Sequence, residues 1–177
     1  MVKYRGEFDA NMEHGIGVAY YDDGNRKYNG NWYQGSYQGM GFVFDANGDK
    51  KYHGNLDQGI KSGFGTQFYD NGEIFYEGEF AYDKMDGIGK SYYEDGTLKY
   101  SGGLKNGQRD GFGTAYNSKG VKIYDGHYAG GLKNGNGVNY DSQDGHKVYN
   151  GDFQNGKQIG WGATYDENEN MVYEGEL

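Results

Sequence analysis

The chain has 177 residues, a net charge of −9, and a hydrophobic fraction of 34%, of which more than half is aromatic (18% of the chain). This composition excludes a conventional two-layer core of Leu, Ile and Val, whereas 20 Tyr, 9 Phe and 2 Trp argue against a disordered chain. The absence of Cys excludes disulfides and thiolate metal sites, and the excess of carboxylates over Lys and Arg argues against nucleic-acid binding.

A Tyr-x-Gly pair recurs along the whole chain, in steps of 24 residues with a single step of 25. The tyrosines are Tyr4, Tyr28, Tyr52, Tyr76, Tyr100, Tyr124, Tyr149 and Tyr173. A second marker, Gly-x-Gly, recurs in the same phase, and its first glycines are Gly15, Gly39, Gly63, Gly87, Gly111, Gly135 and Gly160. The period predicts a repeat protein with seven units, which start at the first seven tyrosines, and a terminal half unit at 173–177. We expect one domain over 1–177.

Each unit contains two predicted strands, as the first unit illustrates. Tyr4, Gly6 and Phe8 alternate with polar residues, and Ile16, Val18 and Tyr20 alternate with small ones. Such alternation over about five residues is typical of a strand with one covered face. The closing aromatic of the second strand recurs as Phe44, Phe68, Tyr92, Tyr116, Tyr140 and Tyr165, and we expect these rings to lie between successive repeat tyrosines.

A turn signal follows each second strand, such as Asp23-Gly24 or Asn47-Gly48. These pairs favour type I′ hairpin turns, in which both central residues have positive φ. The extra residue of the sixth unit falls in this turn, where 141–145 replaces the shorter 117–120. We therefore predict an all-β fold, an elongated, twisted antiparallel meander of β-hairpins in a single, solenoid-like sheet.

The pattern Tyr-x-Gly-x-Phe, a polar stretch, Gly-x-Gly-x-x-x-Tyr and then Asp/Asn-Gly resembles the MORN repeat, in the 24-residue variant common in bacteria. The resemblance covers essentially the whole chain. It implies an elongated sheet with an aromatic groove and a role in protein interaction, oligomerisation or membrane association. Asn136 departs from the pattern, since the equivalent residues are Ile16, Met40, Phe64, Ile88, Phe112 and Trp161.

The residues give no support for catalysis or for a cofactor. No Gly-x-Gly is followed by Lys-Ser/Thr or by a predicted helix, so the glycines are interpreted as structural rather than as a phosphate cradle. His14, His53, His127 and His146 share no ligand spacing and are treated as surface residues. Acidic turns such as 166–169 permit weak calcium binding, but turn formation and solubility explain them more simply. We expect no enzyme, no cofactor and no metal.

The leading hypothesis is a protein-interaction scaffold whose partner is another protein, since Tyr and Trp dominate contact hot spots. The candidate contact residues are Trp32, Tyr33, Tyr37 and Trp161. By their positions in the repeat, both tryptophans are more simply interpreted as members of the packed row of rings. The alternatives are a carbohydrate-binding module and, with less support, binding to phosphoinositides or anionic membranes. The start of the chain has no apolar signal region, so we expect a cytoplasmic protein. The chain begins and ends with the first strand of a repeat, so head-to-tail stacking would place two such strands side by side and break their alternation. We therefore predict a monomer or an edge-paired dimer.

Overall fold

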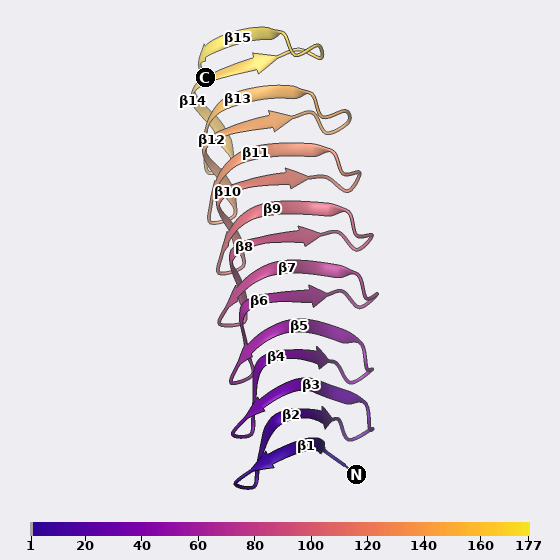
Figure 1. Cartoon of the computed structure of the whole chain (residues 1–177). Coiled ribbons are helices and arrows are strands. Elements are labelled where there is room, and N and C mark those ends of the chain that lie inside the picture. Colours follow the sequence, from indigo (N-terminus) through magenta and orange to yellow (C-terminus); the bar gives the residue numbers. More distant parts are fainter. Residues whose placement is uncertain (1) are drawn as a thin grey trace. The chain divides into compact units, whose positions relative to one another are not determined.

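The computed structural model describes residues 2–177, and these residues form strands and turns with no helix. Fifteen antiparallel strands make a single open sheet in which every strand lies next to its neighbours in the sequence (Figure 1). The prediction of an all-β meander of hairpins is confirmed. Within the described part of the chain there is also no helix of the length and apolar character needed to cross a bilayer.

The chain divides into two compact units, one ending at Met85 and the other covering Asp86–Leu177. Unit 1 contains β1 (Tyr4–Asp9), β2 (Met12–Tyr20), β3 (Arg26–Tyr33), β4 (Ser36–Phe44), β5 (Lys50–Asp57), β6 (Ile60–Phe68) and β7 (Ile74–Ala81). Strand β8 (Lys84–Tyr92) runs across the division. Unit 2 continues with β9 (Leu98–Lys105), β10 (Gln108–Tyr116), β11 (Lys122–Ala129), β12 (Leu132–Tyr140), β13 (Lys147–Gln154), β14 (Lys157–Tyr165) and β15 (Met171–Glu176). The single domain over 1–177 stays a prediction.

In each of the two compact units the core is a row of repeat tyrosines whose rings lie on glycines. We call this row the tyrosine ladder. The ring of Tyr28 is fully buried over Gly41, where a Cβ would lie 2.3 Å from the tyrosine Oη. The Tyr28 hydroxyl donates a hydrogen bond of 2.8 Å to the carbonyl of Asn31 in its own strand. The same bond, from the tyrosine to the carbonyl three residues later, recurs at 2.8–3.1 Å for all eight repeat tyrosines. Glycine is required at this position because any side chain would displace the ring.

The side chain that packs between two successive repeat tyrosines comes from the first strand of a repeat, the strand that carries the tyrosine itself. Trp32 packs edge-on against both Tyr4 and Tyr28, with centroids 4.9 and 5.4 Å apart. The expectation that the closing aromatics of the second strand fill this place is wrong. Ala19 of β2 is paired with Tyr28 of β3 and lies on the same face of the sheet, so its neighbour Tyr20 points to the opposite face. On that face basic residues cover the closing rings, as Lys147 covers Tyr165 at 3.7 Å.

The turn between successive repeats differs in type from the prediction. Asp23-Gly24 is not a type I′ turn, because only Gly24 has a positive φ (94°) and its N–H donates to the carbonyl of Tyr21. The Asp23 carboxylate accepts the N–H of Asn25, as Asp does in an Asx turn. The turns with two positive φ angles are instead those that join the two strands of one unit, for example Ala10-Asn11 at 47° and 64°. The second-type strands therefore start earlier than predicted, at Met12 in the first unit.

The extra residue of the sixth unit lies in the loop between β12 and β13, as predicted. Here the N–H of Asp141 bonds to the carbonyl of His146, whereas in the shorter loop the N–H of Tyr21 bonds to Asn25. Strands β12 and β13 keep the lengths of their counterparts in the other units.

The Ala10-Asn11 turn gives a first testable prediction. Alanine at φ 47° carries the strain of a left-handed conformation, whereas the equivalent Asn155-Gly156 turn suits both angles. The double variant Ala10→Asn/Asn11→Gly is expected to slow amide exchange in the β1–β2 hairpin about fivefold, equivalent to about 1 kcal/mol. The reverse exchange, Asn155→Ala/Gly156→Asn, is expected to speed exchange in β13–β14 by a similar factor. Equal exchange in all three proteins would contradict this assignment of turn types.

Candidate functional site

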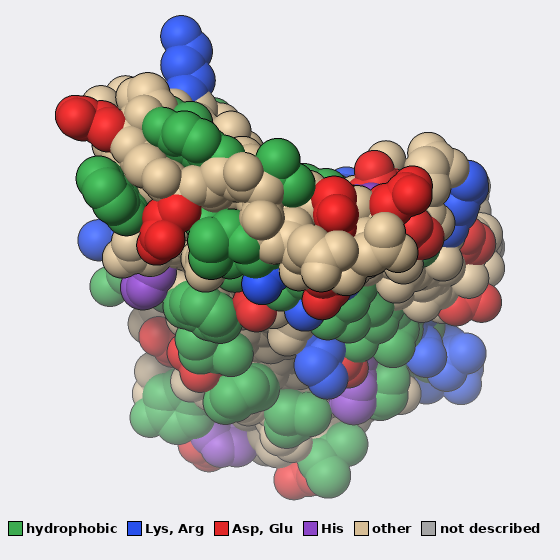
Figure 2. Space-filling view, turned by 90° about the horizontal axis from the view of Figure 1, so that it is seen from above, with side chains coloured by type: hydrophobic (Ala, Val, Ile, Leu, Met, Phe, Trp, Pro, Cys, Tyr) green, Lys and Arg blue, Asp and Glu red, His purple; other side chains and the backbone are tan. Residues whose placement is uncertain are grey.

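A row of exposed apolar side chains lies on the face of the sheet opposite the tyrosine ladder. Each of these side chains stands between the two glycines of a Gly-x-Gly, and alternation along the strand points it away from the buried rings. We call this set the exposed row: Ile16, Met40 and Phe64 in unit 1, and Ile88, Phe112 and Trp161 in unit 2. Their exposed fractions run from 46% for Met40 to 65% for Ile16 and Phe64. Figure 2 shows hydrophobic side chains open at the surface, with charged groups beside them.

Polar residues on the neighbouring strand lie opposite most side chains of the exposed row. In unit 1, Ile16 lies opposite Asn31 and Met40 lies opposite Asn55. In unit 2, the ring of Phe112 packs against His127 with centroids 5.6 Å apart. Apolar groups bordered by hydrogen-bonding groups are typical of surfaces that bind other proteins.

The other face carries a groove above the tyrosine ladder, where basic residues cover buried rings. Lys61 lies over Tyr52 in unit 1, and Arg109 and Lys133 lie over Tyr100 and Tyr124 in unit 2, with cation-to-centroid distances of 5.3, 4.6 and 4.5 Å. Burial lowers the pKa of Lys61 and of Lys133. These cations combine packing with charge in one position of the repeat.

Burial also changes the acidity of several repeat tyrosines. It raises the pKa of Tyr28, Tyr52 and Tyr100 to about 12, and raises that of Tyr124 further. The neutral phenol is the form that fits the ladder, because an ionised oxygen could not donate to the carbonyl three residues later. Near neutral pH this face therefore offers neutral phenol rings beside cations.

The structure separates the four predicted contact residues. Trp32 is 7% exposed, and its indole N–H donates to the carbonyl of Gly17, so it belongs to the ladder and offers a partner little surface. Tyr37 is half-buried and stacks on Tyr28 at 3.9 Å. Tyr33 is 53% exposed and lines an open hollow of about 640 Å³ together with Gln38 and Asp57. Trp161 is 62% exposed and belongs to the exposed row, not to the ladder.

The roles of these four residues as contacts stay predictions. Sequence reasoning treated the rest of the exposed row only as a repeat slot and missed the groove cations. The signal for the row was present, since an apolar residue between two glycines has no neighbouring side chain on its strand to cover it.

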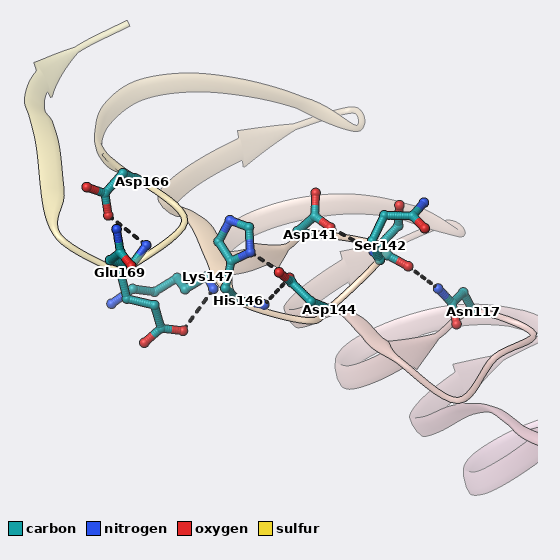
Figure 3. Close-up of polar contacts among 10 residues, drawn as sticks. Asn117, Asp141, Ser142, Asp144, His146, Lys147, Asp166 and Glu169 are labelled. Carbon is teal, nitrogen blue, oxygen red and sulfur yellow. Dashed lines mark hydrogen bonds and ion pairs between the residues drawn. The ribbon is translucent and has the colours of Figure 1, made fainter.

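The one candidate metal cluster within residues 2–177 combines Asp141, Asp144 and His146, whose possible ligand atoms lie within 4.8 Å of one another. Figure 3 shows the Asp144 carboxylate pointing toward His146, and its Oδ1 lies 2.6 Å from Nδ1. Hydrogen bonds from His146 lower the pKa of Asp144, and the bond to Asp144 raises the pKa of His146. Asp141 in turn accepts the N–H of Gln143. Ordinary turn hydrogen bonds thus engage these side chains.

The other histidines pack against aromatic rings. His53 stacks on Phe42 with centroids 4.0 Å apart, and the half-buried His14 lies 5.3 Å from the ring of Tyr33. The expectation that all four are surface residues is thus too simple for His14 and His53, because the sheet supplies a neighbouring ring at their positions.

Comparison with known proteins identifies the repeat. The family model described as MORN repeat matches residues 4–26, 52–74, 76–98, 100–121 and 124–145, which together cover more than half of the chain. A search of curated proteins finds no match. MORN repeats are generally protein- or membrane-interaction modules, and the family is typically non-catalytic. Because the tyrosine ladder repeats along the chain and the family model covers more than half of it, the chain belongs to the MORN repeat family.

Proposed function

We propose that this chain is a non-catalytic scaffold that binds another protein through the exposed row. The observation that supports this is the exposure of six large apolar side chains at the same position of the repeat, each at least 46% open. Exposed large apolar side chains are costly in water, and where they gather they mark interaction sites in soluble proteins. A covering partner would gain about 25 cal/mol for each Å² of apolar surface removed from water.

The composition of the exposed row favours protein over carbohydrate or membrane. Sugars stack on flat rings, and three of the six side chains, Ile16, Met40 and Ile88, have none. An anionic membrane attracts a basic surface, whereas this chain has a net charge of −9. A mixture of aliphatic and aromatic groups bordered by Asn and His suits the uneven surface of a folded protein or a bound peptide.

Site-specific photo-crosslinking tests the proposal. A photoreactive benzoylphenylalanine at Phe64 or at Phe112 is expected to form adducts with a discrete partner protein in cells of the source organism. The same group at Tyr82, which is 85% exposed in the β7–β8 turn, is the matched control and is expected to form no discrete adduct. Substituting Ile16 and Met40 by Ser is expected to abolish the adducts at Phe64. Because these side chains are exposed, the same substitutions should change the free energy of unfolding by no more than about 1 kcal/mol.

Two outcomes would refute the proposal. One is the same pattern of adducts at Phe64, Phe112 and Tyr82, which would mean random collision. The other is the absence of protein adducts together with saturable binding to a glycan array or to anionic vesicles, which would transfer the function to one of the alternatives.

A further inference from the structure

Unit 2 carries two cations at the same repeat position in neighbouring repeats, and both lie in the groove above the tyrosine ladder. Arg109 comes from β10 and Lys133 from β12. Elements two strands apart in a sheet are separated by about 10 Å. In unit 1 the equivalent positions hold Glu13, Tyr37, Lys61 and Met85, so no two cations follow one another there.

Buried aromatic rings hold both cations in place. The Arg109 guanidinium lies over Tyr100 and Tyr128, at 4.6 and 5.4 Å from the centroids, and donates to the Tyr128 hydroxyl at 3.3 Å. The Lys133 ammonium lies over Tyr124 and Phe153 at 4.5 and 5.7 Å. It also donates a hydrogen bond of 2.6 Å to Oδ1 of Asn139. The rings fix the positions of the charges before any ligand arrives, which reduces the entropy lost on binding.

Neither cation is neutralised within the part of the chain that the structure describes. No carboxylate oxygen of residues 2–177 is in ion-pair contact with Arg109 or Lys133. The nearby carboxylates of Asp110 and Asp125 accept hydrogen bonds from the N–H of Gly130 and from the Thr114 hydroxyl. Burial, with the charge of Arg109 as the second cause, lowers the pKa of Lys133. Two like charges in a partly desolvated groove repel, and an incoming anion would relieve that repulsion.

The groove between these cations has the size and lining for part of a peptide. Its volume is about 250 Å³, and Ile123, Leu132 and the rings of Tyr124 and Tyr128 form apolar walls beside the two charges. An extended chain presents side chains alternately to its two sides, so it can direct carboxylates to both cations and an apolar side chain between them.

We propose that this groove of unit 2 is a second binding site, which takes an acidic, extended segment of a partner protein with one carboxylate on Arg109 and another on Lys133. Charge complementarity carries the choice of ligand, because neither cation is in ion-pair contact with a carboxylate of residues 2–177. The net charge of −9 opposes the approach of a flat anionic bilayer, whereas a single peptide can enter the groove. The site goes beyond the proposed function, since the exposed row lies on the opposite face.

Fluorescence anisotropy with labelled peptides tests the site on the full chain. The probe is a twelve-residue peptide of three Glu-Leu-Gly-Glu repeats, and its control replaces every Glu by Gln. We expect saturable binding of the Glu peptide, weakened by added salt, and no saturable binding of the Gln peptide. The double variant Arg109→Gln/Lys133→Gln is expected to bind the Glu peptide about tenfold or more weakly. Lys61→Gln, at the same repeat position in unit 1, is expected to leave the affinity unchanged.

A charge-preserving variant separates loss of charge from loss of folding. Arg109→Lys/Lys133→Arg keeps both cations and is expected to bind within about threefold of the unmodified chain. Equal binding of the Glu and Gln peptides, or an unweakened Arg109→Gln/Lys133→Gln variant, would overturn the proposal. Binding to phosphatidylserine vesicles that depends on the two cations, without binding of the Glu peptide, would overturn it in favour of a lipid surface. None of these results bears on crosslinking from the exposed row, so the two proposals fail independently.

Discussion

Replacing Gly41 by alanine is expected to lower the free energy of unfolding by about 3 kcal/mol, the upper end of the usual cost of overpacking a core. A Cβ at this position would lie 2.3 Å from both Oη and Cε2 of Tyr28. The ring cannot move aside easily, since it is fully buried, stacks on Tyr37 and donates to the Asn31 carbonyl. Urea denaturation monitored by tyrosine circular dichroism measures the loss.

Two controls isolate the steric cause. Gly24→Ala places a methyl group where no atom lies within 4 Å but where φ is 94°, so it is expected to cost only the backbone strain, about 1 kcal/mol. In a Tyr28→Ala background the space over Gly41 is empty, so the further change Gly41→Ala is expected to cost less than about 1 kcal/mol. The same penalty with and without the Tyr28 ring would contradict the idea that the ring determines the need for glycine.

Raising the pH from 10 to 12 is expected to unfold the protein cooperatively. The pKa of Tyr28, Tyr52 and Tyr100 rises to about 12 in the folded state, from an ordinary value of 10.0 in the unfolded chain. Because the folded pKa is the higher one, the unfolded chain releases protons first, and the stabilisation is complete below pH 10 and lost as the pH rises through 12. Each of these three tyrosines contributes a proton to the slope, so the loss is steep.

The urea midpoint measured at several pH values, together with tyrosinate absorbance, tests this expectation. Tyr52→Phe is expected to reduce stability at neutral pH by about 1 kcal/mol, the usual worth of a hydrogen bond, because its bond of 2.9 Å to Asn55 is lost. Above pH 10 the same variant should show a shallower pH slope, since one titrating group is gone. Tyr82→Phe, at an 85% exposed ring, is the control and should change neither property. A stability that stays constant up to pH 12 would show that these phenols are not protected by folding.

The ladder could be predicted from sequence because its two partners, tyrosine and glycine, recur at fixed spacing and no other residue can replace the glycine. The turn types could not. Ala10-Asn11 carries little turn signal, yet it adopts two positive φ angles, because the short connection between β1 and β2 requires them. The stronger signal, Asp23-Gly24, is satisfied by a side-chain hydrogen bond and one left-handed glycine.

The candidate sites show the same division. Trp32 and Trp161 are the same residue type, but they point to opposite faces of the sheet. The alternation of side chains along each strand buries Trp32 and exposes Trp161. The exposed row follows from parity, because the residue between the two glycines of Gly-x-Gly points away from the face that the glycines share with the repeat tyrosines. The cation pair of unit 2 could not be predicted in this way, because the contact of Lys133 with Phe153 depends on which strands lie together and on how far a long side chain extends.

Every repeat tyrosine finds its hydroxyl acceptor three positions later in its own strand. The hydroxyl of each repeat tyrosine therefore finds its acceptor inside the segment that encodes it, while backbone hydrogen bonds of the sheet and ring packing join one segment to the next. A gene that gains or loses one whole 24-residue segment leaves no repeat tyrosine without an acceptor, so recombination between segments can lengthen or shorten the sheet in fixed steps without redesigning the interior.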